Sequence, residues 1–170
     1  LRNYMQVIPS LFAYNAFCVM TDMSDTRVGT ITASEDRFMQ WKTADGDYSK
    51  IANKIAIRWT TLLDGMFPKE RLLDILRNFI CFSKSEEGTA KILAAYHQYF
   101  GVHKAVDSTL HAMNSDGKAG VFWHTQGSGK SLSMVFYAHL LAEQVSSPTI
   151  VVTTDRTDLD GQLYSQFAKC

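Results

Sequence analysis

Residues 124–131, which read His-Thr-Gln-Gly-Ser-Gly-Lys-Ser, combine the residue types and the spacing needed to bind a polyphosphate. Gly127 and Gly129 allow the backbone to curl, so that successive N–H groups point at one phosphate and the following helix adds its dipole. Lys130 reaches the β- and γ-phosphates in such a loop, and the Ser131 hydroxyl ligates Mg²⁺. The sequence therefore predicts a P-loop for ATP and Mg²⁺, with the phosphate-binding residues Thr125, Gln126, Gly127, Ser128, Gly129, Lys130 and Ser131.

The first position of the loop departs from the usual pattern. That pattern, GxxxxGK[ST], has a glycine where this chain has His124. The turn into the loop must then be made without glycine, as in many helicase-like motors. We interpret His124 as a turn residue packed by its neighbours. The other histidines lack the spacing of metal ligands, so Mg²⁺ carried with ATP is the metal ion that we expect.

A strand before the loop and a helix after it must position these residues. Residues 119–123 are apolar and predict a buried strand, and the apolar side chains of 131–143 recur on one helical face. A second strand is predicted over 149–154, and a helix follows it toward the last residue. Strand, helix and strand in this order predict a βαβ unit with two parallel strands.

The upstream part of the chain predicts shorter elements. Segments 15–20 and 27–32 are rich in β-branched and apolar residues and flank a polar turn, which indicates a hairpin. The polar stretch 43–47 is the best candidate for a linker, so we place a domain boundary near residue 45. Apolar residues then recur at helical spacing, which predicts helices over 48–63 and 69–77. A short strand at 79–82, a polar loop at 83–88 and helices over 89–113 with a break at Gly101 follow.

Composition limits the class of protein. Lys plus Arg number 17 and Asp plus Glu number 17, so any contact with nucleic acid must be local. Three cysteines without a CxxC motif favour a reducing cytosol over a secreted disulfide framework. The apolar stretches fall short of the ~18 residues that a membrane span needs. We therefore expect a cytoplasmic protein without membrane contact.

Six segments carry a wider pattern: FWHTQGSGKSLSMVF at 122–136, VVTTDRTDLDGQL at 151–163, AAYHQYFGVHKAV at 94–106, IPSLFAYN at 8–15, RFMQWK at 37–42 and Gly29-Thr30. Together they resemble the motor subunit of type I restriction endonucleases. The resemblance covers nearly the whole chain and is weakest through 44–77.

This resemblance implies an α/β fold with three parts. These are the C-terminal part of an α/β nuclease domain over 1–45, a helical connector over 46–88 and the start of a RecA-like motor domain over 89–170. In the RecA-like domain, helices flank a parallel sheet. Such subunits belong to helicase superfamily 2 and hydrolyse ATP to pull double-stranded DNA past a complex held at its recognition site, then cut it. The implied partners are double-stranded DNA and the methyltransferase and specificity subunits. We expect a fragment, inactive alone, with sequence missing on both sides.

Five residues take roles from the resemblance, each beside a simpler interpretation. Gln98 matches the glutamine that reads adenine, since an amide donates and accepts at once; a solvated residue on a helix face is the alternative. Arg156, Asp158 and Gln162 lie in a motif that touches one DNA strand, although a helix N-terminus explains the acidic residues equally well. Tyr4 matches a nuclease-associated tyrosine, and an ordinary amphipathic tyrosine is the alternative.

Two other functions remain open. One is a helicase-like ATPase of repair or remodelling without a nuclease, and the other is a nucleotide-sensing P-loop module without hydrolysis. Asp155 ends the second predicted strand and resembles a Mg²⁺-positioning aspartate, but the match of 155–159 to the DNA-contacting motif argues against that role. The sequence contains no Glu-x-Lys group. We therefore expect the nuclease acids, and the acidic pair of the motor, outside these residues.

Overall fold

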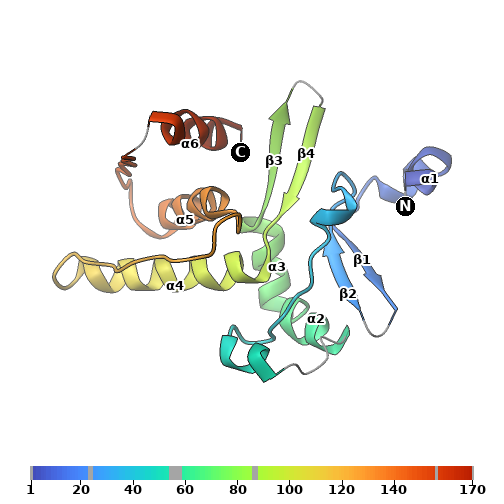
Figure 1. Ribbon diagram of the computed structural model, residues 1–170, viewed down its shortest axis with the longest axis horizontal. Coiled ribbons are helices and arrows are strands. Elements are labelled where there is room, and N and C mark those ends of the chain that lie inside the picture. The colour runs from blue at the N-terminus through green and yellow to red at the C-terminus, as the bar shows by residue number, and fades with distance from the viewer. Residues whose placement is uncertain (1, 23–24, 54–58, 86–87, 156, 170) are drawn as a thin grey trace.

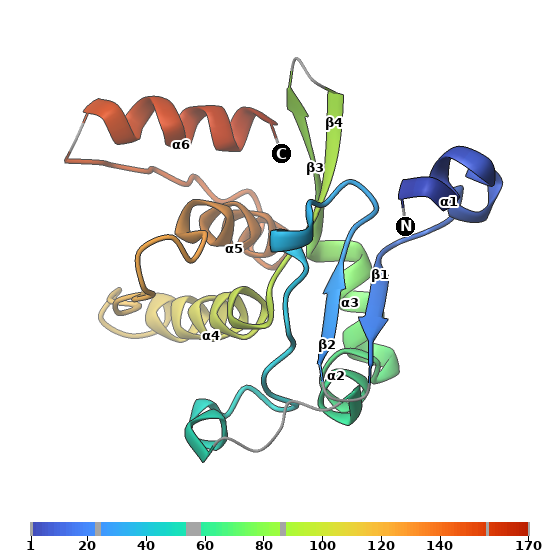
Figure 2. The ribbon, with the colours of Figure 1, turned by 45° about the vertical axis from the view of Figure 1, so that its right-hand side comes forward.

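The computed structural model describes residues 2–22, 25–53, 59–85, 88–155 and 157–169 (Figure 1). Its architecture is mixed α/β, with two separate antiparallel two-stranded sheets and several helices. Helices α4 (Tyr96–Met113) and α5 (Lys130–Gln144) pack side by side, and α6 (Thr157–Lys169) packs against α5 (Figures 1 and 2). The predicted mixture of helices and strands is thus present, but its sheets are antiparallel.

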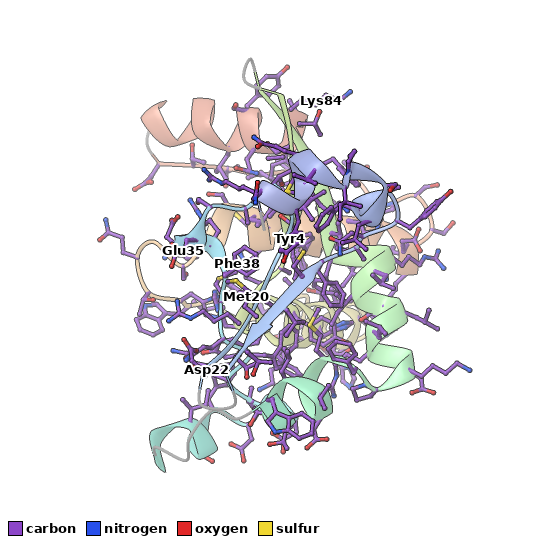
Figure 3. All side chains as sticks on the ribbon, turned by 90° about the vertical axis from the view of Figure 1, so that its right-hand side faces the viewer. Tyr4, Met20, Asp22, Glu35, Phe38 and Lys84 are labelled. Atoms are coloured by element: carbon purple, nitrogen blue, oxygen red, sulfur yellow. The ribbon has the colours of Figure 1, made fainter. Side chains whose placement is uncertain are left out.

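The N-terminal hairpin confirms one prediction. After α1 (Arg2–Val7), β1 (Cys18–Thr21) pairs antiparallel with β2 (Thr26–Gly29). The chain then turns back, and Val28 forms an isolated antiparallel bridge with Met39. Gly29 allows this return, because a Cβ atom there would lie 2.8 Å from the ring of the buried Phe38, which Figure 3 labels.

Helices form within the range 48–77, where the sequence predicts them. The second helix, predicted over 69–77, is confirmed as α3 (Lys69–Asn78). The first, predicted over 48–63, is a 3-10 helix at Tyr48–Asn53 and then α2 (Trp59–Met66); residues 54–58 lie outside the described residues. Pro68 stands directly before α3, where its missing N–H costs no helical hydrogen bond.

Residues 79–93 differ in part from the prediction. β3 (Ile80–Ser85) confirms the short strand, but the next stretch, predicted as a polar loop and a helix, contains β4 (Gly88–Leu93). The two strands pair antiparallel from Ile80 opposite Leu93 to Ser85 opposite Gly88. Cross-strand pairing therefore overrides the helical spacing: alternate residues of 88–93 bond to β3, and the outward-facing backbone of Lys91 bonds to the Thr30 and Thr32 hydroxyls.

α4 runs without interruption, so the predicted break at Gly101 is wrong. The glycine serves packing: a Cβ atom there would lie 3.0 Å from the ring of Phe122. The segment before the P-loop can therefore approach the helix closely. The helix predicted over 131–143 is confirmed as α5.

The two strands predicted around the P-loop are not strands in this structure. Residues 119–123 and 149–154 carry no strand pairing, and their apolar side chains are largely exposed, Trp123 and Val151 at 78% each. The first segment instead lies along α4, where the Ser108 hydroxyl donates to the main-chain oxygen of Ala119. A strand needs a neighbouring strand, and the described residues place none beside either segment.

One hydrophobic core joins the predicted parts of the chain. Trp41 from the N-terminal segment is 1% exposed and contacts the rings of Tyr99 and Phe100 on α4. Gly65 on α2 makes room for it, since a Cβ atom there would lie 2.4 Å from the Trp41 ring. The division at 45 and 88 stays a prediction. The shared core consists of Val28, Trp41, Leu62, Met66, Ile75, Phe79, Leu93, Ala94, Tyr99, Phe100, Val102, Val106, Phe136 and Leu140.

Candidate nucleotide-binding site

The predicted P-loop has the backbone that its glycines permit. Gly127 and Gly129 both have φ of +78°, in the left-handed region that favours glycine. Gly129 forms the N-cap of α5, and its main-chain oxygen accepts the N–H of Ser133 at 3.0 Å. Within the described residues, no atom lies within 4 Å of a Cβ built on Gly127, so the loop keeps open space at this point. A phosphate can therefore approach the backbone there.

Lys130 is turned onto the loop itself. Its Nζ atom donates to the main-chain oxygens of His124 at 2.9 Å and Thr125 at 3.0 Å. The side chain is exposed, and Ser131 beside it, in the first turn of α5, is half-buried. A polyphosphate would offer the ammonium group charged acceptors, which form stronger hydrogen bonds than carbonyl oxygens do.

Gln98 lies between α4 and the P-loop. Its side chain is 4% exposed, so the alternative of a solvated glutamine is wrong. The Oε1 atom accepts the N–H of Ala95 at 2.8 Å, and Nε2 donates to the main-chain oxygen of Gly129 at 3.1 Å. Both ends of the amide are thus engaged with the backbone. Its contact with adenine stays a prediction, for which the second N–H and the second lone pair of the amide are available.

Two histidines pack beside the loop. The His97 and His124 rings lie 5.1 Å apart, and Nε2 of His97 is 3.0 Å from the main-chain oxygen of Ser128. Burial, reinforced by the positive charges of His97 and Lys130, lowers the pKa of His124. His124 also contacts the ring of Phe122, which agrees with its interpretation as a packed turn residue. With its pKa lowered, His124 adds no positive charge at neutral pH to that of Lys130.

Two buried polar atoms at the loop test whether a nucleotide fits. Ser128 Oγ and His124 Nδ1 have no hydrogen-bond partner among the described groups. Buried polar atoms in native proteins are nearly always paired, so an orphaned pair marks a place where a ligand or water belongs. With the open space at Gly127, the Ser128 hydroxyl is suited to donate to a bound polyphosphate.

A pocket of about 490 Å³ opens beside the loop, within the size range of small-molecule sites. Its walls come from three stretches: the P-loop, the first turn of α4 and the N-terminal segment. The lining residues are Thr125, Gln126, Gly127, Ser128, Ala95, Tyr96, His97, Arg27, Met39, Gln40 and Lys42.

Sequence reasoning missed the N-terminal wall of this pocket. Arg27, Gln40 and Lys42 lie more than 80 residues before the P-loop, and no local pattern connects them to it. The one available signal was the segment at 37–42, which carries part of the family resemblance. It gave no role to Gln40 or Lys42.

The remaining predicted residues lie elsewhere or outside the described part. Tyr4, labelled in Figure 3, is on α1 and 61% exposed. Arg156 lies outside the described residues, as do the side chains of Asp158 and Gln162 on α6. Their roles at DNA and in the nuclease stay predictions. Asp155 is exposed after the second extended segment.

Two kinds of feature are absent from the part of the chain that the structure describes. Among these residues, no group of three or more His, Cys, Asp or Glu side chains stands close enough to hold a metal ion. No described helix has both the length and the apolar character needed to cross a membrane.

Known proteins resemble this chain along nearly its whole length. The type I restriction enzyme HindI endonuclease subunit of Haemophilus influenzae is 45% identical over 98% of the chain. A putative type I restriction enzyme endonuclease subunit of Methanocaldococcus jannaschii, MjaIXP, is 35% identical over 98% of it, and another, MjaVIIIP, is 31% identical over 95%. Residues 97–170 also match the SWI2/SNF2 ATPase family.

The matched region is a small part of each relative. The chain spans 16% of the length of the Haemophilus influenzae subunit and 18% of the MjaIXP subunit. The SWI2/SNF2 match begins at the start of α4 and includes the P-loop, so the ATPase similarity and the candidate site coincide. From these similarities, the chain belongs to the family of type I restriction enzyme endonuclease subunits, with a helicase-like ATPase segment over 97–170.

Proposed function

We propose that this chain forms the nucleotide-binding part of an ATP-driven motor. The observation that carries the proposal is the P-loop at the start of α5, with two left-handed glycines, an accessible lysine and a pocket beside it. Backbone N–H groups at a helix N-terminus and a lysine suit the charge of a polyphosphate. When bound, ATP with Mg²⁺ supplies the energy for movement along DNA.

Each residue of the loop has a separate task in this proposal. Lys130 leaves the carbonyl oxygens of His124 and Thr125 and donates to the β- and γ-phosphates. Ser131 orients its hydroxyl toward Mg²⁺. Gln98 holds the start of α4 against the loop and offers its amide to adenine, so the base and the phosphates are bound by one connected unit.

We further propose that a RecA-like parallel sheet forms around segments 119–123 and 149–154 in the complete subunit. The support is their composition: Val121, Trp123 and Val151 are apolar, largely exposed and in segments without a partner strand among the described residues. Neighbouring strands would pair the backbone and bury these side chains, each worth about 1.5–3 kcal/mol when fully buried.

For the whole subunit we propose ATP-dependent movement along double-stranded DNA coupled to DNA cleavage. The names of the relatives support this, since they describe endonuclease subunits of type I restriction enzymes. Methyltransferase and specificity subunits are the proposed partners. The motif at 156–162 is proposed to touch one DNA strand, and Tyr4 to lie with the nuclease. We propose a cytoplasmic location for the subunit, which its three cysteines without a CxxC motif support.

A second candidate is a remodelling or repair ATPase without a nuclease. The match of 97–170 to the SWI2/SNF2 ATPase family favours it. The two candidates differ in one measurable product. The complete subunit with its partners would cut DNA in the first case, and would hydrolyse ATP on DNA without cutting in the second.

Replacement of Lys130 tests the proposed nucleotide site. In the complete subunit, Lys130→Ala should weaken binding of Mg²⁺-ATP, measured by calorimetry, by at least about tenfold, and abolish ATP-dependent DNA cleavage. Lys118→Ala is the matched control, because Lys118 is also exposed and lies outside the pocket lining. Equal affinity in the two variants would refute the assignment.

A further inference from the structure

The N-terminal segment gives the pocket beside the P-loop a positively charged wall. Arg27 lies on β2, and Gln40 and Lys42 follow the bridge between Val28 and Met39. The described lining holds these two cations and no carboxylate, and the Asp25 carboxylate beside it offsets part of the charge of Arg27. A pocket with this charge favours an anionic ligand.

Asp25 fixes the position of two of these side chains. Its Oδ2 atom accepts from Nε of Arg27 at 2.7 Å, and its Oδ1 atom accepts from Nε2 of Gln40 at 2.8 Å. The hydrogen bonds from Gln40 and Arg27 lower the pKa of Asp25. Its carboxylate therefore stays ionised and holds β2 and the returning segment together at the pocket.

This arrangement leaves part of the guanidinium available. The contact with Asp25 uses Nε, and no described group pairs with the two terminal nitrogens of Arg27. The Arg27 side chain is 46% exposed, so a ligand can reach it. A guanidinium presents several N–H donors in one plane, which suits the oxygens of a phosphate chain.

We propose that Arg27, positioned by Asp25, donates to the polyphosphate of a nucleotide bound at the P-loop. The inference rests on the proposed function, because it requires that the loop hold a nucleotide. Arg27 lines the pocket together with Thr125, Gln126, Gly127 and Ser128, so the phosphates lie between the loop backbone and β2. The nucleotide then joins the N-terminal hairpin to the motor segment, and its binding strengthens the contact between them.

Calorimetry on the complete subunit tests this contact with two probes, Mg²⁺-ATP and inorganic tripolyphosphate. Arg27→Ala should lower the affinity for both probes by at least about tenfold, and each tenfold corresponds to about 1.4 kcal/mol of binding free energy. Arg37→Ala is the matched control: this arginine belongs to the same segment, pairs with Asp36 and lies outside the pocket lining. Asp25→Ala should lower the affinity for both probes less than Arg27→Ala does, since it frees the Arg27 side chain without removing it.

The outcomes separate this inference from the proposed function. If Lys130→Ala leaves ATP binding unchanged, the nucleotide site itself is refuted. If Lys130→Ala weakens ATP binding but Arg27→Ala and Arg37→Ala bind the probes with equal affinity, the Arg27 contact alone is overturned. If Arg27→Ala weakens the binding of ATP but not of tripolyphosphate, the proposed contact is also overturned, because Arg27 would then contact the nucleoside and not the phosphates. Arg27→Lys, which keeps the charge, should bind both probes more tightly than Arg27→Ala; equal binding by the two variants overturns the contact as well.

Discussion

The side-chain amide of Gln98 donates to the main-chain oxygen of Gly129 at 3.1 Å, across 31 residues of sequence. The same side chain accepts the N–H of Ala95 at the start of α4. One glutamine thus fixes the P-loop to a helix that is remote in sequence. The nucleotide site and the core around α4 are therefore mechanically connected.

Removal of this amide should reduce stability. Gln98→Ala leaves the buried Ala95 N–H without its acceptor, and an unsatisfied buried donor costs about 1–3 kcal/mol. The Gly129 oxygen loses the bond from Gln98 but keeps the one from the Ser133 N–H. Urea unfolding of the protein should show a lower free energy of unfolding. Gln144→Ala, at an exposed position that ends α5, is the control and should change little. Equal stability in the two variants would contradict the contact.

The same variant tests adenine recognition. If Gln98 also forms hydrogen bonds with adenine, Gln98→Ala should weaken the binding of ATP more than that of GTP, by about 1–3 kcal/mol of binding free energy. The comparison cancels any general loosening of the loop, because both nucleotides share the phosphates. Equal losses for ATP and GTP would limit Gln98 to its structural role.

Two glycines of the P-loop should respond differently to alanine. Both have φ of +78°, and the left-handed conformation costs a residue with a Cβ about 1–2 kcal/mol. Only at Gly129 would the new Cβ collide, at 2.7 Å from Nε2 of Gln98. Gly129→Ala should therefore lower the melting temperature more than Gly127→Ala. A larger effect at Gly127 would contradict the described loop.

Stability should also depend on pH through His124. Its pKa is lowered in the folded protein, chiefly by burial, from an ordinary value of 6.5. As pH falls below 6.5, the unfolded chain binds a proton that the folded protein resists, so the free energy of unfolding decreases until pH passes the folded pKa. His124→Gln should flatten this decline in urea unfolding between neutral and mildly acidic pH. His111→Gln, at an exposed position on α4, is the control and should keep the decline.

The sequence was sufficient for the P-loop because its signal is local. The glycines, Lys130 and helix α5 all lie within about twenty residues. The structure contains the helix and the left-handed glycines, and the phosphate contact of Lys130 stays a prediction. The strands at 119–123 and 149–154 were predicted from side chains alone, whereas a strand also needs a neighbouring backbone. Arg27 reaches the site because long-range contacts, among them those of Val28 and Trp41, join the N-terminal segment to the core. A pattern within one segment cannot reveal such a contact.

The close fit of Trp41 against α2 gives the last prediction. A Cβ atom at Gly65 would lie 2.4 Å from the Trp41 ring and 2.8 Å from the main-chain oxygen of Thr43. Trp41 is 1% exposed, so its ring has no space to withdraw. Gly65→Ala should therefore destabilise the protein by about 1–3 kcal/mol in urea unfolding, as overpacking in a core does. Gly161→Ala in α6 meets nothing within 4 Å among the described residues and should be neutral or slightly stabilising, since alanine favours a helix. Unchanged stability for Gly65→Ala would show that Trp41 is not packed against α2. The N-terminal segment would then lack one of the core contacts that hold Arg27 near the P-loop.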